Sequence, residues 1–239
     1  MIKELNVPLI NIEDQKRIAA AEVNYKQWMF RVIEPFLGEQ ILEIGCGSGA
    51  ITQFLKQKKC VVASDADEQC VAFLKHRFSD APCVTSLCAN VAAEQFSRHL
   101  QGYTFDTVVC LNVLEHIADD QLALRNMHAV LAPGGRLVLL VPAYQWLFGE
   151  GDRIVGHVRR YAKKQLHATV VEAGFTIEKI FFMHSTGIPA WFLYNKILNK
   201  REGMQEVSVY DRYIVPLVAR FEKAIPLPFG LSLICIAKK

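Results

Sequence analysis

The stretch Ile41-Leu-Glu-Ile-Gly-Cys-Gly-Ser-Gly49 runs from a short apolar segment into a loop in which glycine alternates with small residues. Residues 40–44 have the apolar character of a buried strand, and the pattern of residues 50–58 is typical of a helix. Glycine lets such a loop turn tightly and approach a ligand closely, because no Cβ atom stands in the way. A helix that begins after the loop offers free backbone N–H groups to a carboxylate or phosphate. We therefore expect a ligand-binding strand–loop–helix unit here.

Strand-like and helix-like segments alternate around this unit. The strands that we expect next lie at residues 60–64, 82–87, 105–111 and 136–141. The expected helices lie at residues 13–37, 67–78, 94–100 and 119–131. Continuous aliphatic strands without polar alternation favour a parallel sheet with helices on both faces. The pattern predicts one doubly wound, mostly parallel α/β domain over residues 1–239, with residues 1–38 as an N-terminal helical cap.

The last third of the chain has a different pattern. A helix at 161–173, a strand at 175–182 and a final strand at 230–237 are expected, and an insertion rich in aromatic and aliphatic residues, 186–229, separates the two strands. Helical spacing occurs in it at 191–198 and 210–223. Three interpretations remain open: a lid over the substrate, a homodimer interface, or a peripheral membrane contact. The last is favoured by the basic residues of the insertion, since basic amphipathic helices bind membrane surfaces; these residues are Lys196, Lys200, Arg201, Arg212, Arg220 and Lys223.

Composition excludes several classes of protein. The chain has 239 residues, 51% of them hydrophobic and 21% charged, and its net charge of +3 is too small to indicate a nucleic-acid binder. Its seven cysteines include no CxxC pair, which favours reduced, buried thiols in a cytosolic protein. The first residues have no apolar signal-peptide core, and no apolar run reaches the ~18 residues of a membrane span. We expect a cytoplasmic protein, with contact at the inner face of the membrane if the insertion binds there.

Two acids stand at the ends of expected strands. Glu43 lies within an apolar strand, and a buried acid requires an ammonium group or N–H donors beside it. Asp65 ends the second strand, where acids of doubly wound folds accept hydrogen bonds from ribose hydroxyls. The alternative for Asp65 is to cap the following helix, but Asp67 is better placed for that. The glycine spacing GxGxG also differs from the GxGxxG of nicotinamide enzymes, which disfavours an oxidoreductase.

Together with FDTVVCLNVLEHI at 105–117 and LAPGGRLVLLVP at 131–142, these motifs resemble the class I S-adenosylmethionine (SAM)-dependent methyltransferases over about residues 25–185. The resemblance implies a seven-stranded sheet whose last strand is antiparallel, SAM as the cofactor and S-adenosylhomocysteine as the product. It also implies a role for each cofactor-binding residue: Glu43, Gly45, Cys46, Gly47 and Gly49 around the methionine moiety, Asp65 at the ribose, Ala66 and Asn90 at the adenine, and Leu111 and Asn112 on the methionine side.

The sequence after the fourth strand narrows the class of acceptor. Similar enzymes that methylate amines of nucleic-acid bases carry an Asn/Asp-Pro-Pro-aromatic motif here, whereas this chain has Leu111-Asn-Val-Leu114. The Leu-Glu-His form at 114–116 resembles small-molecule methyltransferases, including quinone O-methyltransferases. Some of those use acids around this motif to bind a metal. Asn112 replaces one such acid, so no metal is expected.

Two clusters are candidates for the acceptor side. His116 and His157 are candidate general bases, because imidazole titrates near neutral pH. Arg159, Arg160 and Tyr161 are candidates for binding the acceptor. The alternative is that His157 and Arg160 only hold loops together through backbone carbonyls.

The expected function is methyl transfer from SAM to a small-molecule or lipid-linked acceptor, at oxygen. Methylation of protein or RNA, and a SAM-binding protein without catalysis, remain alternatives.

Overall fold

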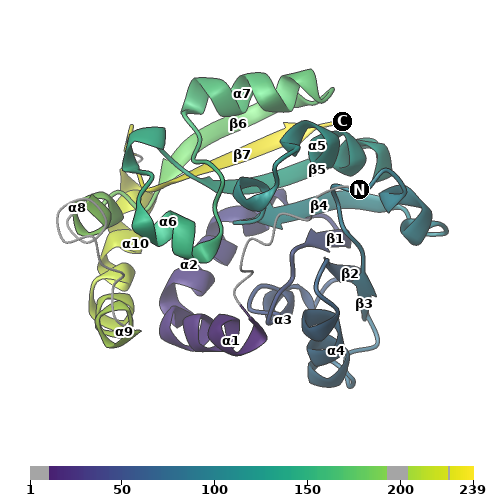
Figure 1. Ribbon diagram of the computed structural model, residues 1–239, viewed down its shortest axis with the longest axis horizontal. Coiled ribbons are helices and arrows are strands. Elements are labelled where there is room, and N and C mark those ends of the chain that lie inside the picture. Colours follow the sequence, from purple (N-terminus) through teal and green to yellow (C-terminus); the bar gives the residue numbers. More distant parts are fainter. Residues whose placement is uncertain (1–10, 193–203, 226) are drawn as a thin grey trace.

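The computed structural model describes residues 11–192, 204–225 and 227–239. Its centre is one seven-stranded sheet with the order β3-β2-β1-β4-β5-β7-β6 (Figure 1). β7 pairs antiparallel with β5 and β6, and the other pairings are parallel. The predicted fold is therefore confirmed. The strands are β1 (Gln40–Ile44), β2 (Cys60–Asp65), β3 (Val84–Cys88), β4 (Phe105–Leu111), β5 (Leu131–Pro142), β6 (Thr176–Met183) and β7 (Ser232–Lys238).

Helices cover both faces of the sheet, as Figure 1 shows. Leu137 and Leu139 of β5 pack in the cluster that includes α5 (Asp120–Val130) and α7 (Lys163–Glu172). Val138 and Leu140 of the same strand pack in the opposite cluster, with α2 (Val23–Ile33) and α10 (Val215–Ala224). Both faces of β5 are thus buried, which explains its aliphatic sequence. The other α-helices are α1 (Ile12–Ala21), α3 (Thr52–Leu55), α4 (Glu68–Arg77), α6 (Glu150–Val155), α8 (Gly187–Phe192) and α9 (Met204–Tyr213).

Several boundaries differ from the sequence-based predictions. The long helix expected at 13–37 breaks at Glu22 into α1 and α2, followed by a 3₁₀ turn, η1 (Glu34–Phe36). The helix expected at 94–100 is the 3₁₀ helix η2 (Phe96–Leu100). The helix expected at 210–223 splits at Ile214, because Pro216 lacks the N–H that a continuous helix would need there and is tolerated in the first turn of α10.

Some features lie beyond the predictions. The sequence indicated neither α6 nor the 3₁₀ helices η3 (Leu114–His116) and η4 (Gln145–Leu147). Within the insertion, residues 193–203, which include Lys196, Lys200 and Arg201, lie outside the described residues. All seven cysteines are free, but Cys88 is exposed and Cys60 and Cys83 are only half-buried. In the described part of the chain, no helix has the length and apolar character needed to cross a membrane.

The insertion is anchored to the first helices by a buried carboxylate. Asp211 of α9 accepts hydrogen bonds from the backbone N–H groups of Asn24 at 2.9 Å and Tyr25 at 2.8 Å. These N–H groups belong to the first turn of α2, and N–H groups in the first turn of a helix have no acceptor within that helix. The break at Glu22 therefore exposes donors that α9 satisfies. The described part of the insertion is consequently packed on the domain.

We predict that Asp211→Ala lowers the free energy of unfolding by about 1–2 kcal/mol, because two N–H donors of α2 lose their acceptor. Urea denaturation followed by circular dichroism measures this change. Arg212→Ala, at the exposed neighbouring position, is the matched control and is expected to have little effect. Equal stability of the two variants would contradict the anchoring role of Asp211.

Candidate functional site

The loop between β1 and α3 has the backbone conformation that its glycines allow. Gly45, Gly47 and Gly49 have φ values of 69°, 50° and 75°, in the left-handed region that side chains disfavour. A Cβ atom at Gly45 would also collide with Val113, and one at Gly47 with Gln15 of α1. The N–H groups of Gly45 and Cys46 donate to the carbonyl of Ser64 at 2.8 and 3.0 Å, which fastens the loop to β2. The glycines thus let the loop turn tightly and pack closely on neighbouring side chains beside the carboxyl ends of β1 and β2.

Asp65 links this loop to the next helix. Its carboxylate accepts hydrogen bonds from the N–H of Gly47 at 2.8 Å and from that of Asp67 at 2.9 Å. Burial raises the pKa of Asp65, and these two hydrogen bonds oppose the rise. Asp67 caps α4 by accepting from Gln69, as predicted. Each carboxylate oxygen of Asp65 retains a lone pair, so this side chain can still accept from a ligand hydroxyl.

Glu43 is buried at the centre of the sheet, one residue before the end of β1. Thr52 donates its hydroxyl to Glu43 Oε2 at 2.7 Å. Burial raises the pKa of Glu43 to about 8, and the Thr52 hydrogen bond acts in the opposite direction. The hydroxyl of Thr52 is thus a donor that the sequence did not reveal. A cationic ligand beside Glu43 would favour its ionised form.

The residues expected around the adenine and the methionine lie along the same edge of the sheet. Ala66 is exposed after β2, and Asn90 is exposed after β3, where its side-chain oxygen already accepts from the N–H of Ala92 at 2.9 Å. Cys46 is buried, and burial raises the pKa of its thiol. Leu111 and Asn112 are half-buried at the end of β4.

Among the residues that the structure describes, three other than glycine have positive φ, and all three follow the carboxyl end of a strand. They are Asn112 after β4, Tyr144 after β5 and His184 after β6, with φ values of 55°, 63° and 65°. Such conformations are costly and tend to occur at functional sites. They direct the chain sharply away from the sheet at the edge where the glycine loop and Asp65 lie.

A second cluster forms where the segments after β4 and β5 meet. The N–H of Val158 donates to the carbonyl of Glu115 at 2.8 Å and holds the two segments together. The rings of His116 and His157 are 4.7 Å apart, and His157 Nε2 lies 3.7 Å from Glu115 Oε1. Glu115 is fully buried, and neither of its carboxylate oxygens has a hydrogen-bond partner; His116 Nδ1 also has none. Burial raises the pKa of Glu115 to about 8 and lowers that of His116 to about 4.

Asp152 of α6 orients His157. Its Oδ1 lies 2.6 Å from His157 Nδ1, and both of its oxygens accept from Arg160 Nε at 2.9 Å. Burial alone would raise the pKa of Asp152, but the hydrogen bonds from His157 and Arg160 lower it overall. An ionised carboxylate only accepts, so Nδ1 carries the proton and Nε2 of neutral His157 has a free lone pair. Asp152 was not singled out in the sequence, because nothing local marks it as buried.

The residues after His157 make side-chain contacts within the protein. Arg160 is buried, stacks on the ring of Trp191 with 4.3 Å between the guanidinium and the ring centroid, and is held by Asp152. Arg159 pairs with Asp120 at 2.5 Å, and the buried Tyr161 donates its hydroxyl to the same carboxylate at 2.8 Å. All three side chains are engaged within the protein, and their expected role as acceptor ligands stays a prediction. They hold the loop after β5 in place, by side-chain contacts more than by the backbone carbonyls of the alternative prediction.

Comparisons with known proteins agree with this geometry. Residues 42–137 match the family described as a methyltransferase domain. The ubiquinone biosynthesis O-methyltransferase of Pseudomonas aeruginosa is 32% identical over 104 residues, which cover 43% of this chain and 44% of that protein. The match therefore spans less than half the length of this relative.

Solved structures extend the likeness of fold over nearly the whole chain. The N-methyltransferase NodS from Bradyrhizobium japonicum, in complex with S-adenosyl-L-homocysteine, aligns with a TM-score of 0.57 at 17% identity over 98% of this chain and 91% of that chain. The (4+2)-cyclase SpnF aligns with a TM-score of 0.60 at 17% identity over 91% and 80%.

Residues 42–137 thus resemble a methyltransferase domain, and the fold of the chain is similar to that of a solved methyltransferase. The cofactor of the methyltransferases that it resembles is SAM, and two carboxylates present here suit that molecule: Glu43 can accept from its ammonium group and Asp65 from its ribose hydroxyls. The fold alone does not define the reaction, since the neighbour SpnF is described as a cyclase.

We predict that Asp65→Ala weakens SAM binding by about 1–3 kcal/mol, because a charged acceptor of ribose hydroxyls and the support of Gly47 are both lost. Isothermal titration calorimetry measures the affinity. Asp67→Ala is the matched control: it removes the adjacent carboxylate, which caps α4, and is expected to leave the affinity nearly unchanged. Wild-type affinity in Asp65→Ala would remove this residue from the cofactor site.

Proposed function

We propose that the chain transfers the methyl group of SAM to an oxygen atom of a small, largely apolar or lipid-linked acceptor. The observation that carries the proposal is the Asp152–His157 pair, which leaves His157 Nε2 with a free lone pair beside Glu115 and His116. Such a nitrogen can take the proton of an acceptor hydroxyl. The likeness of residues 42–137 to methyltransferase domains, and the O-methyltransferase relative, support the same reaction.

The proposed reaction requires few groups. The C–S bond of the sulfonium breaks as the acceptor oxygen bonds to the methyl carbon, and the neutral thioether of S-adenosylhomocysteine leaves. The hydroxyl proton passes to His157 Nε2, and the imidazolium is stabilised by the ionised Asp152 at Nδ1. Because the sulfonium is already activated, alignment and exclusion of water supply most of the rate, and the base assists an acceptor that is poorly acidic.

The cofactor roles in this proposal follow the sequence motifs. Glu43 and the loop of residues 45–49 bind the methionine moiety, and Asp65 binds the ribose. Ala66 and Asn90 lie beside the adenine, and the Asn90 carbonyl oxygen, which accepts once from Ala92, keeps a second lone pair for the adenine amino group. Leu111 and Asn112 border the methionine chain. The ring of His116 packs against the ring of His157, the proposed base.

The test uses methyl-labelled SAM, the purified protein and a cell extract that is afterwards separated into organic, aqueous, RNA and protein fractions. We expect label in the organic fraction, and we expect His157→Ala to lower the rate of transfer by about a hundredfold or more with SAM affinity unchanged. His167→Ala, on the exposed surface of α7, is the control and should transfer label normally.

The other outcomes have defined meanings. Label in the RNA or protein fraction would show that the acceptor is a macromolecule and not a small molecule. SAM binding without label in any fraction would indicate a SAM-binding protein that does not catalyse. Full activity of His157→Ala would exclude His157 as the general base.

A divalent metal ion is a second candidate for the same three residues. Glu115, His116 and His157 each offer one ligand atom, and these atoms lie within 4.8 Å of one another. Two imidazoles and one carboxylate suit zinc or a similar transition metal, with an open position for another ligand. The buried carboxylate oxygens of Glu115 have no hydrogen-bond partners, which favours a metal ion as their partner. Asp152 would orient His157 through Nδ1, in the way that a second carboxylate commonly orients a metal-binding histidine. The metal would act as a Lewis acid that makes an acceptor hydroxyl more acidic.

This candidate differs from the prediction of no metal, which depended on Asn112. The third donor comes instead from His157, which follows the next strand, β5, in the chain. If the site binds Zn²⁺, titration calorimetry should detect it in wild-type protein, and Glu115→Gln should weaken binding at least about tenfold. His76→Ala, an exposed histidine on α4, is the control. Equal Zn²⁺ affinity in wild type and Glu115→Gln, or full activity after dialysis against EDTA, would leave His157 as a base.

A further inference from the structure

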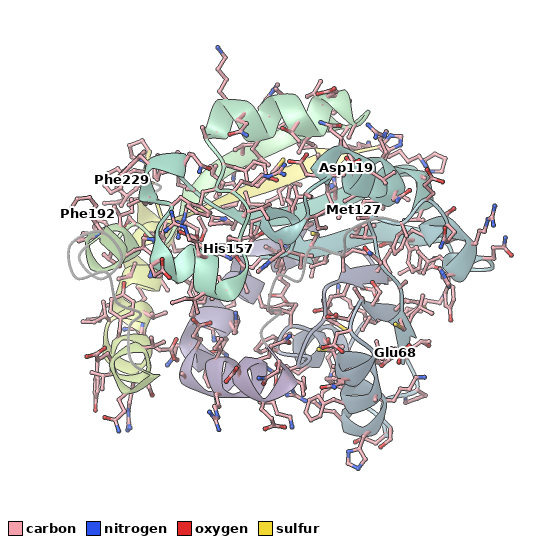
Figure 2. The ribbon with its side chains drawn as sticks, viewed as in Figure 1. Glu68, Asp119, Met127, His157, Phe192 and Phe229 are labelled. Atoms are coloured by element: carbon pink, nitrogen blue, oxygen red, sulfur yellow. The ribbon has the colours of Figure 1, made fainter. Side chains whose placement is uncertain are left out.

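One edge of the molecule gathers exposed apolar side chains. Figure 1 shows α8, α9 and α10 together at this edge, and Figure 2 shows Phe192 and Phe229 there. Among the described residues, more than half of the large apolar side chains that are exposed lie between residues 192 and 229. These are Phe192, Val209, Tyr213, Ile214, Leu217, Phe221, Ile225 and Phe229. We call this set the apolar edge.

α10 is apolar on two sides. Val215 and Val218 are buried in the cluster beneath the sheet, with α2. Leu217 and Phe221, four residues apart and so on one face of the helix, are 62% and 52% exposed. A helix that is apolar around most of its circumference is ordinarily buried. Large apolar side chains that gather at one edge and are exposed indicate a site of contact with a protein or a membrane.

The charges of α9 and α10 are sorted between inside and outside. The two acids Asp211 and Glu222 face inward: Asp211 accepts from the start of α2, and Glu222 accepts from the N–H groups of His184 and Ser185 at 3.0 and 2.7 Å. The exposed charged residues on the two helices are mainly basic; they are Arg212, Arg220 and Lys223, against Glu206. The surface of these helices is therefore both apolar and positively charged.

We infer that the apolar edge docks on the surface of an anionic phospholipid bilayer. Amphipathic helices with apolar and basic residues bind at the boundary of headgroups and acyl chains, and each basic residue near anionic lipid adds to the attraction. A second copy of the chain is the less favoured partner, because a twofold interface would bring the positively charged side chains of both copies together. The absence of a spanning helix in the described ranges agrees with a contact at the surface of the bilayer.

The apolar edge is connected to the site. The ring of Phe192 lies 6.2 Å from that of Trp146 on η4, and the preceding residue, Trp191, donates its indole N–H to the carbonyl of Leu147 at 3.2 Å. Trp191 also stacks on Arg160, which holds Asp152 behind His157. An acceptor dissolved in the bilayer would thus reach the site past α8. This route rests on the proposed function, whereas the docking itself does not.

The test measures co-sedimentation of the protein with vesicles, without SAM or acceptor. We expect binding to vesicles of phosphatidylglycerol and phosphatidylcholine in equal parts, and much weaker binding to phosphatidylcholine alone. The double variant Leu217→Ser/Phe221→Ser should lower the partition coefficient at least about tenfold, because two large apolar side chains no longer enter the bilayer. Val171→Ser, at an exposed apolar position on α7, is the matched control and should bind as wild type does.

A charge variant completes the design. Arg212→Gln/Arg220→Gln should weaken binding to the anionic vesicles and reduce its dependence on salt. Circular dichroism and urea denaturation establish that each variant is folded. Failure of wild-type protein to bind anionic vesicles, or equal binding by Leu217→Ser/Phe221→Ser, would overturn the proposal. A wild-type dimer that this variant dissociates, without vesicle binding, would instead make the edge a homodimer interface. Because no methyl transfer is measured, failure of the proposed function would leave these outcomes unchanged.

Discussion

The site depends on the parallel alignment of the strands that carry it. β1, β2 and β4 run in one direction, so their carboxyl ends, with the glycine loop, Asp65 and Asn112, meet at one edge of the sheet. β5 and β6 end at the same edge, because each is antiparallel to β7. Segments far apart in the sequence therefore converge without any need for local sequence signals. Ligands of open α/β sheets bind at this edge for the same reason.

Within that edge, Asp152 is the group on which the acceptor side depends. Its side chain is fully buried, and its carboxylate oxygens accept hydrogen bonds from His157, from Arg160 and from the N–H of Gly149, the residue before α6. Loss of one partner from a buried set of charges leaves the others unpaired, which costs more than an exposed pair contributes. The hydrogen bond to Asp152 fixes the tautomer of His157. Asp152 thus acts through His157 and is not itself expected to bind SAM or the acceptor.

The two buried acids affect folding as well as binding. The pKa values of Glu43 and Glu115 are raised from 4.5 to about 8, so both side chains are mainly neutral in the folded protein near pH 7. A group with a raised pKa favours the folded state at low pH, and this contribution is lost as the pH rises from about 4.5 to about 8. Residues selected only for stability would not combine burial with so few hydrogen bonds. A cation that arrives with a ligand would favour the ionised form of either side chain.

The sequence predicted the sheet and the cofactor side because their signals are local. Aliphatic runs identify strands that are buried on both faces, as β5 is, and the glycines of residues 45–49 identify a loop with positive φ. The acceptor side could not be predicted in this way. The contact of His157 with Glu115, and the burial of Arg160 and Asp152, arise only when the segments after β4 and β5 meet. Arg159 and Arg160 have the residue type that binds anions, but Asp120 and Asp152 already occupy them.

The chain of contacts from Trp191 through Arg160 and Asp152 to His157 gives the insertion a part in the site. Arg160 and Asp152 neutralise each other, and Glu115 is mainly neutral near pH 7, so the cluster carries little net charge before a ligand binds. A positive charge that enters, whether a proton taken by His157 or a metal ion, would therefore be stabilised by ionisation of Glu115. Arg160 connects the insertion to the base indirectly, because it stacks on Trp191 of α8 and pairs with Asp152, which in turn contacts His157. Movement of α8 would change the stacking on Arg160, and with it the support that Asp152 gives to His157.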